Sequence, residues 1–187
     1  MVFRRLASLV ALLLLPALPA SATQVVHFDT RALVQRSSDI VLGEVQGQRS
    51  FWNERHTKIL TEVTVRVSQT LKGAPAQDLK LVQLGGEVDG MRYNVPGCPV
   101  FTRGEQALLF VWRDAAGRAQ VNALAQGKFD VRPDPASGRL MVQRSLPGLA
   151  LGDVRTLRVV PEGEAAAKIP LDDMVREIQR VMAEGGR

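Results

Sequence analysis

The chain of 187 residues carries one cysteine and a formal charge of +5, from 24 lysines and arginines against 19 acids. Because the basic residues are interleaved with acids instead of gathered in a stripe, the composition argues against nucleic acid as a partner. A lone cysteine excludes an intramolecular disulfide, so the fold must rest on apolar burial, for which a single domain of this length has enough chain.

Residues 1–22 are predicted to be a signal peptide. Arg4 and Arg5 precede a mostly apolar run up to Leu15, and the small residues Ala20 to Ala22 match a signal-peptidase site. This apolar core is shorter than the roughly 18 to 20 residues that a permanent membrane helix needs. We expect an exported protein, periplasmic or extracellular, that keeps no membrane span after cleavage.

The rest of the sequence predicts mostly strands. Two-residue alternation from Ile59 to Ser68 points one set of side chains inward and most of the other set to water. The run from Ala107 to Trp112 is apolar on both faces, which is typical of a central strand. Gly43 indicates a bend or bulge. The expected strands span residues 39–45, 59–68, 78–84, 107–112, 120–124, 129–131, 140–142 and, at an edge, 154–160, with a loop over 85–104 and a hairpin turn over 114–117.

Two helices are expected. Asp29 can cap a short helix that carries Leu33 and Val34. Near the end of the chain, Pro170 suits a first turn, and apolar residues then recur at spacings of three and four up to Val181. We expect this amphipathic helix to pack on its own domain, although docking on a partner in an envelope assembly is an alternative. The predicted organisation is a barrel domain over residues 23–165 and a helix over 166–187.

Three stretches of the chain resemble the netrin and tissue-inhibitor-of-metalloproteinase type of module, as found in exported bacterial proteins; they are Ser38–Val45, Ser68–Gly73 and Gly97–Phe110. The resemblance implies a five-stranded, OB-like antiparallel barrel, here with an extra hairpin. In the metalloproteinase inhibitors of that family an amino-terminal cysteine chelates the protease zinc. Here Thr23 would be the mature terminus and Cys98 has no disulfide partner, so that mechanism does not transfer.

Aromatic side chains in two expected loops are the candidate ligand-binding residues. Phe51, Trp52 and His56 lie before the long alternating strand, and Tyr93 lies in the loop over 85–104. Loops on a rigid barrel often carry binding, and OB barrels bind extended ligands through loops and one sheet face. We therefore expect a non-enzymatic binding module for a protein or another extended extracytoplasmic ligand. A protease inhibitor or protease-accessory protein is an alternative.

A second alternative is a thiol- or metal-dependent enzyme centred on Cys98. Its thiol would need a neighbouring imidazole, and only His27 and His56 are available for catalysis or for a soft metal site. Neither histidine lies in a recognisable motif, and the sequence implies no cofactor. Nothing in it indicates an oligomeric state.

Overall fold

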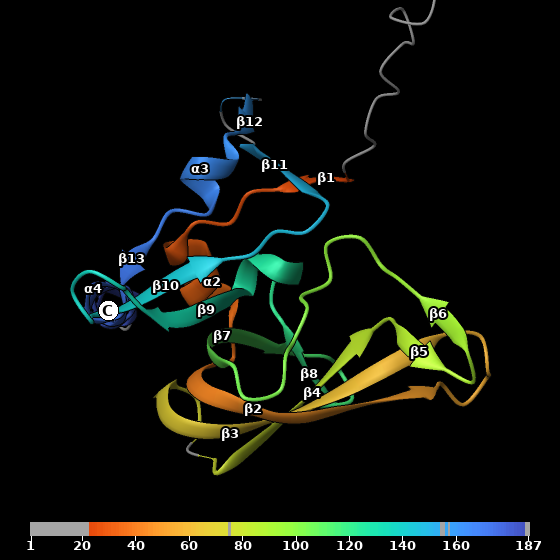
Figure 1. Cartoon of the computed structure of the whole chain (residues 1–187). Coiled ribbons are helices and arrows are strands. Elements are labelled where there is room, and N and C mark those ends of the chain that lie inside the picture. The colour runs from red at the N-terminus through yellow and green to blue at the C-terminus, as the bar shows by residue number, and fades with distance from the viewer. Residues whose placement is uncertain (1–22, 75, 154–155, 157, 186–187) are drawn as a thin grey trace, which may run out of the picture.

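The computed structural model describes residues 23–74, 76–153, 156 and 158–185 (Figure 1). The predicted signal peptide lies outside the described residues. The chain is mainly β, with a closed barrel, additional strands and a carboxy-terminal helix, which confirms the predicted fold class. Its strands are β1 (Thr23–Val26), β2 (Asp39–Trp52), β3 (Ile59–Lys72), β4 (Asp78–Leu84), β5 (Gly86–Val88), β6 (Met91–Tyr93), β7 (Gln106–Arg113), β8 (Ala119–Val121), β9 (Lys128–Pro133), β10 (Leu140–Arg144), β11 (Leu149–Asp153), β12 (Arg158–Val160) and β13 (Ile169–Pro170). Its helices are α2 (Thr30–Arg36), the 3-10 turn η2 (Leu124–Gly127), α3 (Glu162–Ala165) and α4 (Leu171–Gly185).

The barrel closes through the order β7-β2-β3-β4-β8, because β8 pairs with β7 as well as with β4. β7 is the fourth of these strands along the chain and pairs with the first, β2, which gives the 4-1-2-3 order of a Greek key. The pairing of β4 with β8 is parallel and runs through Leu81 and Ala119, whereas the other barrel pairs are antiparallel. The barrel is therefore OB-like and mostly antiparallel, with the β4–β8 pair as its parallel pairing.

Strand β7 separates two apolar cores, as its two apolar faces predict. Leu108 and Phe110 belong to the core that α2 and α4 cover. Leu109 and Val111 belong to the barrel interior, which they share with Val65 of the alternating strand β3. All five side chains are fully buried, so a polar substitution at either face of β7 would leave an unpaired polar group in a core.

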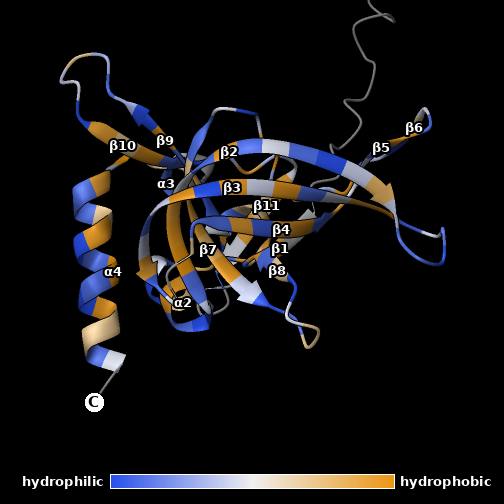
Figure 2. Cartoon of the chain, turned by 90° about the horizontal axis from the view of Figure 1, so that it is seen from below, coloured by the Kyte–Doolittle hydropathy of each residue, from blue (hydrophilic) through white to orange (hydrophobic). Residues whose placement is uncertain are grey.

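The two longer helices pack against each other at one end of the sheet. The Asp29 carboxylate caps α2 by accepting from the Ala32 amide at 2.7 Å, as predicted. Pro170 lies in strand β13, and α4 begins one residue later. Figure 2 shows α4 lying along this end of the sheet. Its buried residues are Leu171, Met174, Ile178 and Val181, which join the core that also holds α2.

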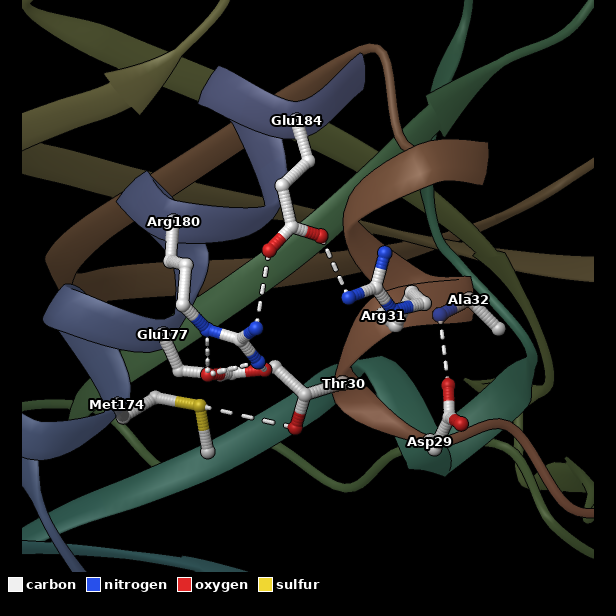
Figure 3. A network of polar contacts seen from close by, with 8 residues as sticks. All are labelled: Asp29, Thr30, Arg31, Ala32, Met174, Glu177, Arg180 and Glu184. Carbon is white, nitrogen blue, oxygen red and sulfur yellow. Dashed lines mark hydrogen bonds and ion pairs between the residues drawn. The ribbon is translucent and has the colours of Figure 1, made fainter.

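A network of ion pairs links the exposed sides of α2 and α4 (Figure 3). Arg31 lies 2.6 Å from Glu184, which also pairs with Arg180 at 3.0 Å, and Arg180 in turn binds Glu177. These side chains are about half exposed, and such pairs contribute about 0 to 1 kcal/mol each because water screens them. The apolar stripe of α4 therefore contributes most of its docking energy.

Strands β2 and β3 are longer than predicted. The register shifts between Leu42 and Gly43, which confirms the predicted irregularity, and a Cβ at Gly43 would lie 2.5 Å from the Arg66 carbonyl oxygen. Because β7 pairs with β2 only as far as Glu44, the remainder of β2 runs on beside β3, which itself still pairs with β4 from Leu60 to Arg66; we call residues 46–64 the ribbon (Figure 1). The hairpin β5–β6 lies against this ribbon.

Two sequence predictions need correction. The expected loop over residues 85–104 contains the β5–β6 hairpin, whose turn residues Asp89 and Gly90 have φ values of 51° and 75°. The strand expected over 120–124 ends at Val121, because Ala123 and Leu124 adopt left-handed φ values that lead into η2. Part of the edge strand expected over 154–160 is β12, and residues 154, 155 and 157 lie outside the described residues.

In the described part of the chain no helix is both long and apolar enough to span a membrane.

Candidate functional site

A hollow of about 1040 Å³ lies around the tip of the ribbon. It is built from three segments that are far apart in the sequence: the β2–β3 tip, the β5–β6 hairpin and the turn between β7 and β8. We call it the ribbon-tip hollow, and its lining residues are Ser50, Phe51, Trp52, Asn53, Glu54, Arg55, His56, Thr57, Lys58, Leu60, Val88 and Arg118.

The tip loop is held in one conformation by Asn53. Its side-chain oxygen accepts from the amides of Thr57 at 2.8 Å and Lys58 at 3.0 Å, while its backbone amide donates to the Lys58 carbonyl. His56 adopts a left-handed φ of 50° and donates its amide to the Asn53 carbonyl. This turn brings the His56 ring onto Trp52, with ring centroids 6.1 Å apart and an interplanar angle of 22°.

The aromatic side chains of the tip are accessible to a ligand. Trp52 and Phe51 are half-buried and His56 is exposed. The Arg49 guanidinium lies over the Phe51 ring at 5.2 Å from its centroid, a cation–π contact that restrains this ring. Three of the four residues predicted from the sequence therefore line one hollow, with two of their rings already stacked.

Tyr93, the fourth predicted residue, lies in a separate groove at the base of the β5–β6 hairpin. This hairpin groove has a volume of about 190 Å³ and also contains Cys98. Exposed apolar side chains surround it, since Leu84 is 40 % exposed, Tyr93 43 % and Val100 67 %. The hairpin thus contacts the ribbon-tip hollow through Val88 and the groove through Tyr93.

A close backbone approach fixes the hairpin to the ribbon. The hydroxyls of Ser50 and Thr61 lie 2.9 Å apart, and Thr61 donates to the Gly85 carbonyl at 2.7 Å. The Glu87 amide donates to the Ser50 hydroxyl at 3.4 Å. A Cβ at Gly86, where φ is 132°, would lie 2.4 Å from both hydroxyl oxygens, so only glycine fits there.

The sequence analysis missed Arg118, which reaches the ribbon-tip hollow from the β7–β8 turn. Asp114 holds that turn by accepting from the amides of Ala116 and Arg118, and its second oxygen lies 2.7 Å from the Arg118 Nε. Hydrogen bonds from Arg118 lower the pKa of the Asp114 carboxyl, because they favour its charged form. The Asp-Ala-Ala-Gly turn was visible in the sequence, but its position beside Trp52 depends on barrel closure.

The three candidates for thiol or metal chemistry lie apart. His56 is at the ribbon tip, Cys98 is in the hairpin groove, and His27 contacts Arg144 beside β10 with nitrogens 3.4 Å apart. Burial raises the pKa of the Cys98 thiol, which disfavours the thiolate. Among the described residues, no three histidine, cysteine, aspartate or glutamate side chains form a group suited to a metal ion.

A third hollow, of about 480 Å³, lies on the β9–β10 hairpin and contains two carboxylates, Asp130 and Asp134. Both are already engaged: Lys128 binds Asp130, and Asp134 accepts from the Ser137 amide and hydroxyl. Lys128 is buried and also lies 3.0 Å from Glu105, so the charges next to this hollow are paired within the fold, although the Nε of Arg144, which lines the hollow, has no hydrogen-bond partner among the described residues.

Comparison with known proteins returned no match: no family model, no curated protein and no solved structure is similar to this chain. The resemblance to netrin-type modules therefore stays a prediction.

Proposed function

We propose that this protein is an exported binding module, without catalytic chemistry, that takes an extended segment of an extracytoplasmic protein across the ribbon-tip hollow. The observation that carries the proposal is the meeting of the β2–β3 tip and the β7–β8 turn at one hollow. These loops join the first to the second and the fourth to the fifth barrel strand, and OB barrels bind extended ligands at these two loops.

The chemistry of the lining supports binding. Trp52 offers a large, partly exposed ring at low cost in side-chain entropy, which is why tryptophan is frequent among the residues that dominate binding energies. The hollow is open and built from three separate segments, a shape that can take an extended polypeptide segment. The separation of Cys98 from His27 and His56 gives no support to the alternative of a thiol- or metal-dependent enzyme.

Selection of peptides tests this proposal. The purified protein is immobilised and panned with a phage library of random dodecapeptides, and enriched peptides are measured by fluorescence anisotropy. Trp52→Ala should weaken them about ten-fold or more, the usual cost of truncating a binding anchor. Trp112→Ala is the matched control, because Trp112 is 37 % exposed on β7 and lies outside the hollow.

The outcomes separate cleanly. If the enriched peptides still bind Trp112→Ala but bind Trp52→Ala much more weakly, the ribbon-tip hollow is supported as the binding site. Equal binding by the two variants, or no enrichment by the unaltered protein, would overturn it. Export is tested separately by sequencing the amino terminus of protein recovered from a periplasmic or culture fraction, where Thr23 should come first.

A further inference from the structure

We propose that Arg118 is the specificity-determining residue of the ribbon-tip hollow, binding a carboxylate of the ligand through its two Nη groups, and that Asp114 is the positioning residue that aims it. This inference rests on the proposed function. It names the ligand class as an acidic peptide segment that carries glutamate or aspartate beside an aromatic or apolar residue.

The geometry of the Arg118–Asp114 pair leaves one edge of the guanidinium open. Asp114 takes the Nε hydrogen bond at 2.7 Å. In the part of the chain that the structure describes, neither Nη atom of Arg118 has a hydrogen-bond partner, although the residue lines the hollow. The Nη groups of a guanidinium can donate two parallel hydrogen bonds to a carboxylate, which is the strongest pairing available to an arginine.

The turn that carries Arg118 is preorganised. Besides the two amide bonds to Asp114, the Gly117 carbonyl accepts from the Arg113 guanidinium at 3.3 Å. Arg113 is itself anchored, because its Nε lies 2.9 Å from the Asp39 carboxylate. A ligand carboxylate therefore meets a guanidinium whose orientation has been fixed in advance, which lowers the entropy lost on binding.

The surrounding charges favour an anion as well. Arg55 and Lys58 also line the hollow, and among the described residues neither side chain forms an ion pair. Glu54 is the carboxylate in the lining. Asp114 neutralises part of the Arg118 charge, so it would weaken the binding of acids if the hollow attracted them by net charge alone. We infer instead that Asp114 orients the Arg118 guanidinium. The two explanations predict opposite effects of removing the Asp114 charge, and the experiment below measures that effect.

The test measures two synthetic probes on the full set of variants. The probes are an octapeptide of alternating glutamate and tyrosine, capped at both ends, and the same peptide with glutamine in place of glutamate. Asp114→Asn keeps an oxygen to accept the two turn amides but loses the anionic contact to Nε. Arg118→Gln removes the guanidinium. Arg139→Ala is the control, since Arg139 is an exposed arginine in the comparable β9–β10 turn and lies outside the hollow.

We expect the glutamate peptide to bind about ten-fold more tightly than the glutamine peptide, and Arg118→Gln to remove most of that preference. Asp114→Asn should weaken binding of the glutamate peptide several-fold although the variant has lost a negative charge, with only a small change in melting temperature. Tighter binding by Asp114→Asn, or equal binding of the two probes, would overturn the inference. If both probes bind equally and Trp52→Ala still weakens them, the proposed function stands without the carboxylate site; binding of neither probe overturns the inference, and the phage selection decides the proposed function separately.

Discussion

Replacing Gly86 with alanine should detach the β5–β6 hairpin from the ribbon. The new Cβ would lie 2.4 Å from the hydroxyl oxygens of Ser50 and Thr61, in a residue whose φ is 132°. The backbone conformation costs about 1 to 3 kcal/mol for a residue other than glycine, and forcing an extra carbon into a filled site costs about 1 to 3 kcal/mol more. A hairpin that stayed docked would therefore carry roughly 2 to 6 kcal/mol of strain.

The chain can escape this strain by local opening. The hairpin has strands of three residues and lies at the surface, so its undocking exposes little of either core. The global free energy of unfolding should fall by less than the full strain, while the local opening of the hairpin becomes much more frequent. Because Val88 and Tyr93 leave with the hairpin, both the ribbon-tip hollow and the hairpin groove should lose a wall.

Trypsin provides the assay, since Arg92 is an exposed residue of β6. Trypsin should cleave Gly86→Ala after Arg92 at least about ten-fold faster than it cleaves the unaltered protein. A strain above roughly 1.4 kcal/mol raises the population of the open hairpin by that factor. Gly90→Ala is the control, because φ is 75° there but nothing lies within 4 Å of the added carbon. Equal cleavage rates in the two variants would refute the close approach. Removing both hydroxyls with Ser50→Ala and Thr61→Ala should partly restore protection to Gly86→Ala.

Three further predictions concern the rest of the molecule. Ile178→Ala should destabilise the protein by about 2 to 4 kcal/mol in urea unfolding, because Ile178 is fully buried, whereas the exposed Arg176→Ala should change stability by less than about 0.5 kcal/mol. The pKa of His27 is lowered by burial and by Arg144, so protonating this imidazole costs more in the folded than in the unfolded chain. The free energy of unfolding should therefore be highest near pH 7 and decline as the pH falls below the unfolded pKa of about 6.5. If the free energy of unfolding of His27→Gln declines just as much over the same pH range, this prediction is wrong. Cys98, whose thiol pKa is raised by burial, should react slowly with a thiol reagent at pH 7 and faster as the pH rises. Rapid labelling of the folded protein at pH 7 would contradict this and would favour the alternative of a thiol enzyme.

Much of the barrel could be predicted from local patterns. The alternation in β3 and the two apolar faces of β7 each report burial directly, since the side chains of a strand alternate between its faces. The cap at Asp29 is equally local. The β5–β6 hairpin was missed because three-residue strands are too short to show alternation, although the Asp89–Gly90 turn is a recognised hairpin sequence.

The candidate site could be predicted only in part, and the reason is topological. Phe51, Trp52 and His56 are neighbours in the sequence, so one loop prediction finds them together. Arg118 joins them only because β8 closes the barrel against both β4 and β7, and this pairing brings a turn some 60 residues away to the ribbon tip. No local pattern encodes such a juxtaposition.

The two parts of the site are stabilised independently of the cores, and this has a consequence for function. Asn53 holds the ribbon tip and Asp114 holds the β7–β8 turn through hydrogen bonds within each loop. A ligand then meets rings and a guanidinium that are already in place, so the cost of ordering them falls on folding instead of on binding. Core substitutions such as Ile178→Ala should therefore lower stability while leaving the affinity of the folded protein unchanged, whereas Asn53→Ala should weaken binding with little effect on the melting temperature. The opposite pattern would mean that the tip is ordered by its ligand.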